Sequence, residues 1–201
     1  MHQHTARLPP EDMTEVAGLL VTTLERTVVD LARTLPVEQA VAAGDAALRR
    51  GATREQLLEV LERGRGWPGL PVARRVVAFL DARSESAGES ASRVVLHRAG
   101  LMPSDLQLEV VDPHDGRLVG RCDFGWRHHR TLGEFDGRVK YGRLLAPGQR
   151  LEDVLYAEKR REDALRDCGW QVVRWSWADL WRDQALAARL HRAFERRRLA
   201  G

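Results

Sequence analysis

Lysine is scarce in this chain, although basic residues are not. Of 32 basic residues only Lys140 and Lys159 are lysines. Arginine in such excess, together with abundant alanine, valine and leucine, is the composition of proteins from GC-rich genomes, so the arginines by themselves do not indicate a function. The net charge of +3 and the isoelectric point of about 9.3 are compatible with nucleic-acid binding but do not require it.

Cysteines and long apolar stretches are scarce as well. Cys122 and Cys168 are far apart and lack the spacing of metal ligands, which predicts two buried, reduced thiols. No apolar run reaches the roughly 18 residues that a membrane helix needs, and the N-terminus has no apolar signal segment. We therefore expect no membrane partner and, by default, a cytoplasmic location, while the sequence leaves the oligomeric state open.

The first part of the chain predicts a small helical module over residues 1–83. Residues 1–21 lead into it without a predicted helix. Apolar residues at helical spacing then follow from Thr22, which stands as the expected N-cap of a capping box with Glu25. Pro36 begins a second helix, Thr53 begins a third with another capping box, and Pro71 begins a fourth. No residues in this part have the types and spacing of a known catalytic motif.

The small, polar residues 84–89 predict a domain boundary, so a second domain is expected over 84–201. Its predicted elements are a helix capped by Ser86 and Glu89, three strands, a helix ending near Cys168, a strand over 170–175 and a last amphipathic helix. Leu106, Leu108 and Val110 alternate as in a half-buried strand, and residues 113–116 form a hairpin turn before the next strand. The fold class is therefore α+β.

Three acidic residues fall on neighbouring predicted strands. Asp123 lies in the second strand, and Glu134 and Asp136 lie two residues apart in the third, so these two point to one face of the sheet. Carboxylates brought close together repel each other, and a hard cation such as Mg²⁺ or Mn²⁺ offsets that repulsion. Such an ion could activate water for phosphodiester hydrolysis. The structural alternative is a strand that runs into a turn at Asp136 and Gly137.

Other residues have a structural and a functional interpretation too. Trp170, Trp175 and Trp177 are expected to pack against the sheet, although an exposed tryptophan could stack on a base. His128 and His129 are expected in a solvated turn. The stretch from Lys159 to Arg161 is expected to be a solvated helix face, or a phosphate-binding patch if it lies beside the site.

The acidic residues and the segments after them resemble a known nuclease family. The stretches 121–126 and 132–137, the helix 158–165 and the segment 169–175 resemble, in this order, the very-short-patch-repair (Vsr)-like endonuclease domains, a branch of the PD-(D/E)XK superfamily. The resemblance covers roughly residues 84–182. It implies a restriction-endonuclease-like α-β-β-β-α-β core with a C-terminal helix, and a DNA endonuclease activity that depends on Mg²⁺ or Mn²⁺.

The resemblance also implies roles for individual residues. Asp123 would be the central metal ligand, Glu134 the second carboxylate, and Asp136 a further ligand at the position where many members of the superfamily have lysine. A carboxylate cannot donate to a phosphate as lysine does, so Lys140 becomes the candidate for the missing cation. Glu89 matches a position that often holds a water- or metal-orienting acid, and its alternative role is the capping box with Ser86.

The helical module resembles a second family. The stretches 7–10, 18–22, 26–33 and 45–48 are similar to the region that comes after the winged helix in actinobacterial AbiEi-like type IV antitoxin proteins, some of which carry a Vsr-like C-terminal domain. This resemblance implies that the winged helix is missing here and that a toxin could be a partner besides DNA.

The sequence supports two competing hypotheses of function. The first is a metal-dependent endonuclease, and the second is a catalytically silent, antitoxin- or regulator-like binding protein on a nuclease fold; an orphan fragment without a function of its own is a third, weaker interpretation. The nuclease hypothesis requires that the three carboxylates converge and that no arginine already neutralises them.

Overall fold

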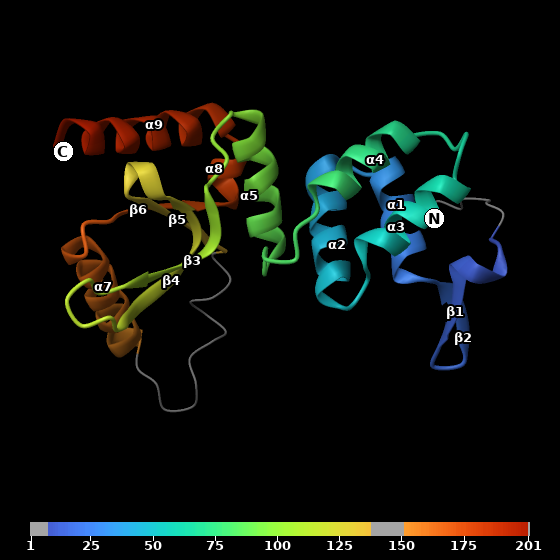
Figure 1. Cartoon of the computed structure of the whole chain (residues 1–201), viewed down its shortest axis with the longest axis horizontal. Coiled ribbons are helices and arrows are strands. Elements are labelled where there is room, and N and C mark those ends of the chain that lie inside the picture. The colour runs from blue at the N-terminus through green and yellow to red at the C-terminus, as the bar shows by residue number, and fades with distance from the viewer. Residues whose placement is uncertain (1–7, 138–150, 201) are drawn as a thin grey trace. The chain divides into compact units, whose positions relative to one another are not determined.

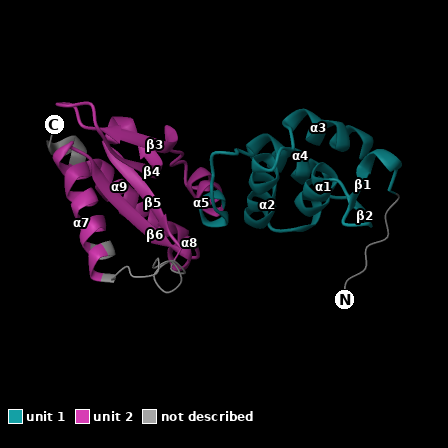
Figure 2. Cartoon of the chain, turned by 90° about the horizontal axis from the view of Figure 1, so that it is seen from below, with its two compact units in different colours: residues 1–90 teal, residues 91–201 magenta. Residues whose placement is uncertain are grey.

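The computed structural model describes residues 8–137 and 151–200, and the chain divides into two compact units, 1–90 and 91–201 (Figure 2). The division lies inside a helix, seven residues after the boundary that the sequence predicts. Among the described residues, no helix has the length and apolar character needed to cross a membrane.

The first unit begins with a hairpin that the sequence did not predict. A short 3-10 turn, η1 (Pro10–Asp12), leads into β1 (Met13–Val16), which pairs antiparallel with β2 (Leu19–Thr22). The turn between the strands uses Ala17 and Gly18, both with positive φ, as two-residue hairpin loops require. The strand signal is weak because each strand has only four residues and neither buries an apolar face.

Four helices complete the first unit, as predicted: α1 (Leu24–Thr34), α2 (Val37–Arg49), α3 (Arg54–Arg63) and α4 (Leu70–Phe79). The capping box at Thr53 is confirmed. The expected cap at Thr22 is wrong by one residue, because Thr23 accepts the hydrogen bond from the Arg26 backbone at 3.2 Å while Thr22 ends β2. The core between the helices is aliphatic and includes Val29, Val41, Leu57 and Val77.

The second unit is a mixed four-stranded sheet with helices on both faces (Figure 1). Helix α5 (Ala87–Arg98) runs into it, and strand order follows chain order. The other elements are β3 (Asp105–Val111), β4 (Leu118–Trp126), the 3-10 turn η2 (Arg127–His129), β5 (Thr131–Asp136), α7 (Leu151–Asp167), β6 (Gln171–Ser176), α8 (Trp177–Leu180) and α9 (Asp183–Ala200).

The pairing of these strands agrees with the predicted order of elements. β3 with β4 and β4 with β5 are antiparallel, whereas β5 and β6 are parallel and are joined through α7. A parallel pair needs such a crossover, because the chain must return to the end of the sheet at which the first of the two strands began. The predicted α+β class is therefore confirmed.

Two apolar cores lie on opposite faces of this sheet. The α9-side core joins α5, α8 and α9 to the sheet and contains Ala91, Val95, Leu96, Leu101, Phe124, Trp126, Val173, Trp175, Leu180, Leu186, Leu190, Ala193 and Phe194. The α7-side core contains Leu108, Val110, Cys122, Leu132, Leu165, Cys168 and Trp170. Both cysteines are buried and free, as predicted.

The predicted alternation in the first strand of this sheet is wrong in one respect. Leu106 packs against the α9-side core but Leu108 belongs to the α7-side core, although two residues separate them. Gln107 between them has a φ of 54°, which is uncommon outside glycine and interrupts the alternation of the pleat. On β4, Cys122 and Phe124 likewise face opposite cores, so Asp123 lies where the strand changes faces.

The last predicted helix is interrupted. The chain forms the single turn α8, in which Ser176 and Asp179 make a capping box, and α9 begins only at Asp183. Leu180 is therefore on a different element from Leu186, Leu190 and Phe194, although all four lie in the α9-side core. The sequence pattern did not distinguish the two helices because both contribute apolar residues to the same core.

Candidate functional site

The three acidic residues of the predicted site line a single cavity of about 260 Å³ in the second unit. Asp123 reaches it from β4, and Glu134 and Asp136 reach it from β5. Glu158 and Arg161 of α7, Arg174 of β6 and Arg121 of β4 line the same cavity, together with Phe135. The predicted convergence of strands two and three is thus present, but arginines lie among the carboxylates.

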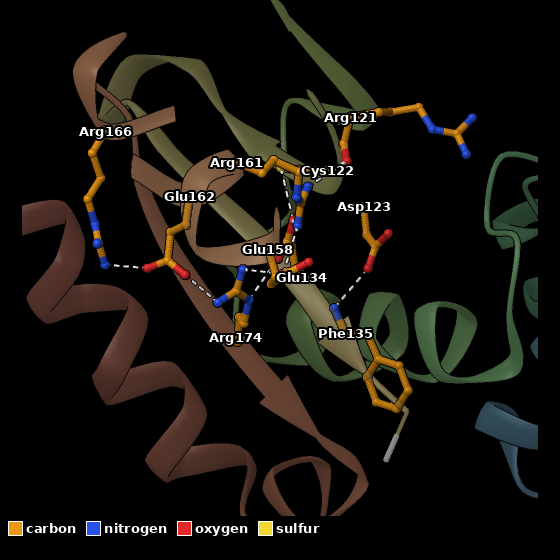
Figure 3. A network of polar contacts seen from close by, with 10 residues as sticks. All are labelled: Arg121, Cys122, Asp123, Glu134, Phe135, Glu158, Arg161, Glu162, Arg166 and Arg174. Carbon is orange, nitrogen blue, oxygen red and sulfur yellow. Dashed lines mark hydrogen bonds and ion pairs between the residues drawn. The ribbon is translucent and has the colours of Figure 1, made fainter. Parts of the chain in front are cut away.

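Asp123 is held by the neighbouring strand. Its Oδ2 accepts a hydrogen bond from the backbone N–H of Phe135 at 2.8 Å (Figure 3). The backbone pairing of β4 with β5 ends at Phe124 and Gly133. Asp123 is the next residue of β4, and its side-chain carboxylate accepts the N–H of β5 that a backbone carbonyl would accept if the pairing continued. This bond fixes the side chain of Asp123 at the end of the paired region, beside Glu134.

Glu134 has a guanidinium partner on each carboxylate oxygen. Its Oε1 lies 2.7 Å from Nη2 of Arg161, and its Oε2 lies 2.8 Å from Nε of Arg174. The parallel register between β5 and β6 places Glu134 directly opposite Arg174. Figure 3 shows Glu134 between these two arginines and Asp123 to one side of them.

A second row of carboxylates lies behind the arginines. Glu158 accepts from Arg161 at 3.1 Å and from Arg174 at 2.7 Å, while Glu162 also pairs with Arg174. Each guanidinium thus contacts more than one acid, and the planar fork of arginine suits such multiple pairing. We call the set of Glu134, Glu158, Arg161, Glu162 and Arg174 the carboxylate–arginine network.

The network sets the protonation states of its members. Burial on its own raises the pKa of Glu134, but the ion pairs with Arg161 and Arg174 outweigh it and hold that pKa below the usual value. Burial lowers the pKa of Arg161, but the charge of Glu134 outweighs it, so the pKa of Arg161 is raised. Glu134 is therefore ionised and fully paired at neutral pH.

Cys122 is a neutral thiol at the edge of this network. Its Sγ lies 3.3 Å from Oε1 of Glu134, to which the thiol donates. Burial, and then the negative charge of Glu134, raise the pKa of the Cys122 thiol. Cys122 is therefore a poor nucleophile and a structural donor to Glu134.

The donor set does not fit a divalent metal ion. Among the described parts of the chain, no three histidine, cysteine, aspartate or glutamate residues are arranged to hold one. Both oxygens of Glu134 already have cationic partners, and a divalent ion bound there would be repelled by the two guanidinium charges. The side chain of Asp136 makes no hydrogen bond or ion pair with other described residues, so it contributes a single unpaired carboxylate.

Two candidates from the sequence remain, Lys140 and Glu89. Lys140 lies outside the described residues. Glu89 belongs to the first unit, where its own N–H donates to Oγ of Ser86 at 3.2 Å and its carboxylate accepts from the Ser86 hydroxyl at 2.7 Å and the Glu85 backbone at 2.8 Å. The capping role that the sequence offered as an alternative is therefore the one that these contacts describe.

The sequence did not identify Arg161 and Arg174 as site residues. Arg161 was expected on a solvated helix face, or in a phosphate-binding patch if that face lay beside the site; it lies in the site, 28% exposed and paired with Glu134. Arg174 had a clear signal, because an arginine between Val173 and Trp175 interrupts an otherwise apolar strand. The spacing of Glu158 and Arg161, three residues apart on one helix, was a second signal.

Three other expectations have an outcome. Trp170 and Trp175 are buried in the two cores, as predicted. Trp177 is more exposed and packs edge-on against Phe135, with ring centroids 5.1 Å apart. The expected solvated turn is wrong for His129, whose ring stacks on Phe194 at a centroid distance of 4.0 Å.

Comparisons with known proteins find relatives but no assigned function. Two proteins of Mycobacterium tuberculosis, Uncharacterized protein MT2308 and Uncharacterized protein Rv2248, are each 34% identical to this chain over 188 residues. The match covers 92% of the chain and 66% of each relative, so the chain spans slightly less than two thirds of their length. No family model matches the chain. No solved structure matches it either.

Proposed function

We propose that the second unit is a nuclease-like domain of the PD-(D/E)XK type that binds nucleic acid without cleaving it. The order α5-β3-β4-β5-α7-β6 and the position of Asp123 and Glu134 at adjacent strands support the relation to this fold. The observation that carries the catalytically silent function is the pairing of both Glu134 oxygens with Arg161 and Arg174.

The cost of freeing Glu134 argues against metal binding. A divalent ion at Asp123 and Glu134 would have to displace two charge-assisted hydrogen bonds, each with a net value of roughly 1.5–3 kcal/mol. It would also lie within a few ångströms of two guanidinium groups, whose charges repel it. An active site of this type would have to reorganise before each turnover.

Charge distribution supports nucleic acid as the ligand. Residues 91–201 contain 21 basic and 16 acidic side chains, whereas residues 1–90 contain 11 and 13. An excess of arginine on one unit favours binding to a phosphate backbone, with an affinity that falls as salt rises. DNA is therefore the proposed partner of the second unit, and a cognate toxin of a type IV toxin–antitoxin system is the further partner that we propose for the chain.

A metal-dependent endonuclease is the second candidate, and one observation favours it. Asp123, Glu134 and Asp136 line the same cavity, as a nuclease site would require. Mg²⁺ or Mn²⁺ would then be the cofactor, and the arginines would have to leave Glu134 when DNA binds.

A nicking assay separates the two candidates. Supercoiled plasmid is incubated with wild-type protein, with Asp123→Ala and with Asp115→Ala, each with Mg²⁺ or Mn²⁺. Asp115 lies in the exposed β3–β4 turn and is the matched control. We expect equal, background nicking by all three proteins. Nicking that needs the metal and is lost only in Asp123→Ala would establish the endonuclease and overturn the proposal.

Binding is measured on the same proteins. Fluorescence anisotropy with a labelled DNA duplex at increasing salt is expected to give an affinity that falls steeply with salt and is unchanged in Asp123→Ala. Absence of binding at low salt would overturn the proposed partner.

A further inference from the structure

A second and larger cavity lies in the second unit, lined by none of the residues of the carboxylate–arginine network. Its volume is about 550 Å³, which is within the usual range of small-molecule sites. Three segments form its walls: the loop after α5 at Leu101 and Met102, the end of β4 with η2, and helix α9. We call it the histidine cavity, because three of the seven histidines of the chain line it: His128, His129 and His191.

Flat aromatic surfaces form the inner wall of this cavity. Trp126 and Phe194 are 5% and 9% exposed, and their ring centroids are 5.6 Å apart. The ring of His129 lies on Phe194 nearly parallel, with an interplanar angle of 15°. The indole N–H of Trp126 donates to the carbonyl of Leu101 at 3.1 Å, which ties the loop after α5 to this wall. The wall is thus fixed, and the ring of His129, the least buried of the three, is the part of it that a planar ligand ring could contact.

Polar groups at the opening have unused hydrogen-bonding capacity. The side chains of His128, His191 and Glu195 are exposed and line the cavity. Within the described residues, none of the three has a side-chain hydrogen bond or an ion pair. A neutral imidazole offers one donor and one acceptor, and an ionised carboxylate only accepts. A ligand that satisfies Glu195 must therefore supply N–H or O–H donors.

The arrangement is not that of a metal centre. No group of three histidine, cysteine, aspartate or glutamate residues in the described ranges is suited to hold an ion, and this includes the histidines of the cavity. The imidazoles are therefore available to an organic ligand.

We propose that the histidine cavity binds an unpaired nucleobase that carries an exocyclic amino group. The planar base packs on the ring of His129, which is itself stacked on Phe194. Its amino and ring N–H groups donate to Glu195, and its remaining edge is satisfied by His128 and His191. Guanine fits best, because its N1–H and its amino group present two adjacent donors to one carboxylate. This site goes beyond the proposed function and is independent of the carboxylate–arginine network.

Calorimetric titration of the full chain tests the ligand class. The probes are guanosine 5′-monophosphate, thymidine 5′-monophosphate and inorganic phosphate. We expect the guanine nucleotide to bind at least about tenfold more tightly than the thymine nucleotide, because thymine has no amino group to donate to Glu195; tenfold corresponds to about 1.4 kcal/mol, close to the net value of one hydrogen bond to a charged group. Inorganic phosphate should give no heat. Equal affinity for the two nucleotides, or no binding of either, would overturn the proposal.

Two pairs of variants locate the site. Glu195→Ala is expected to lose about tenfold in affinity for the guanine nucleotide, whereas Glu109→Ala, an exposed glutamate on β3, keeps wild-type affinity. His191→Ala is expected to weaken binding, and His114→Ala, in the exposed β3–β4 turn, is its control. Because all four side chains are exposed, their removal should leave the fold intact. Unchanged binding in Glu195→Ala and His191→Ala would refute the location.

A further titration decides whether the bound base belongs to a nucleic-acid strand or to a free nucleotide. A single-stranded oligonucleotide with one guanine among thymines is titrated beside the free nucleotide and an all-thymine strand. Tighter binding of the guanine strand than of the free nucleotide would identify a base within a chain, and the reverse would identify a small molecule. If Glu195→Ala has no effect on either ligand, the nucleobase site is refuted, whatever the outcome of the plasmid assay.

Discussion

Each unit of the chain contains a network of arginines and carboxylates, and the two networks differ in their exposure to solvent. In the first unit, Asp12 is 0% exposed and pairs with Arg26, 1% exposed, at 2.8 Å and with Arg63 at 2.5 Å. In the second unit, Glu134 is 13% exposed, and its partners Arg161 and Arg174 are 28% and 34% exposed.

The buried network joins separate elements of the first unit. Asp12 ends η1, Arg26 is in the first turn of α1, and Arg63 ends α3. The guanidinium of Arg26 also lies 4.4 Å from the centroid of the Trp67 ring and contacts Asp30. Every charged group in this set has a partner fixed by the fold, which is the arrangement of a structural ion cluster.

The carboxylate–arginine network instead forms the wall of a cavity. Its arginines each touch more than one acid, and both arginines are partly exposed, so loss of one acid leaves each guanidinium with another partner and with water. The comparison teaches that two arginine–carboxylate pairs of similar length can differ in their access to water, as Asp12–Arg26 and Glu134–Arg174 do. The electrostatic cost of removing one member should differ accordingly.

The largest effect is expected for Asp12→Ala. This change leaves the buried guanidinium of Arg26 with Asp30 as its remaining acid, and breaking a buried ion pair costs about 3–5 kcal/mol. Native-state hydrogen exchange of the α1 and α3 amides reports the unfolding free energy of the first unit separately. Glu11→Ala, an exposed neighbour in the same 3-10 turn, is the control and should have wild-type protection. Equal protection in both variants would remove the distinction between the networks.

A smaller effect is expected for Glu134→Gln. Water can reach Arg161 and Arg174, so the loss should be about 1–2 kcal/mol, measured as the exchange protection of the second unit. The pKa of Glu134 is depressed in the folded state, so its contribution is fully present above the usual glutamate value of 4.5. The contribution disappears as pH falls from that value through the folded pKa.

The change of this stability difference with pH therefore has a definite direction. The stability difference between wild type and Glu134→Gln should be constant at neutral pH and shrink below about pH 4.5. A difference that grows on acidification would mean that Glu134 is not held ionised by the two arginines.

The smallest effect is expected for Glu62→Gln. Glu62 pairs with Arg65 and with Arg74 on the open surface of the first unit. Solvent screens such pairs, and ordering the long side chains offsets the attraction. We expect exchange protection indistinguishable from that of the wild type at physiological salt. A loss comparable to that of Asp12→Ala would show that exposure does not decide the strength of these networks.

Most of the regular structure could be predicted from local signals. The capping box at Thr53, the prolines that begin α2 and α4, and the turn before β4 act within a few residues. The hairpin at Met13–Thr22 and the break between α8 and α9 were missed, because the first has no apolar face and the second lies between apolar residues that belong to one core.

Of the residues in the candidate site, only the carboxylates could be predicted from the sequence. Asp123, Glu134 and Asp136 stand out because acids are rare in strands that are otherwise apolar. Their electrostatic state depends on Arg161 and Arg174, which come from a helix and a strand and lie 27 and 40 residues after Glu134. The histidine cavity also joins distant segments, and His128 and His129 gave no sign of it beyond a polar turn.

The sequence by itself determined the order of the elements, the α+β class and the acids at the strand ends, because helix caps, turns and alternation act over a few neighbouring residues. Only the tertiary structure decided that Glu134 meets two guanidinium groups and that His128, His129 and His191 surround one cavity. Those pairings depend on the parallel register of β5 with β6 and on the packing of α7 and α9 against the sheet, which no local pattern encodes.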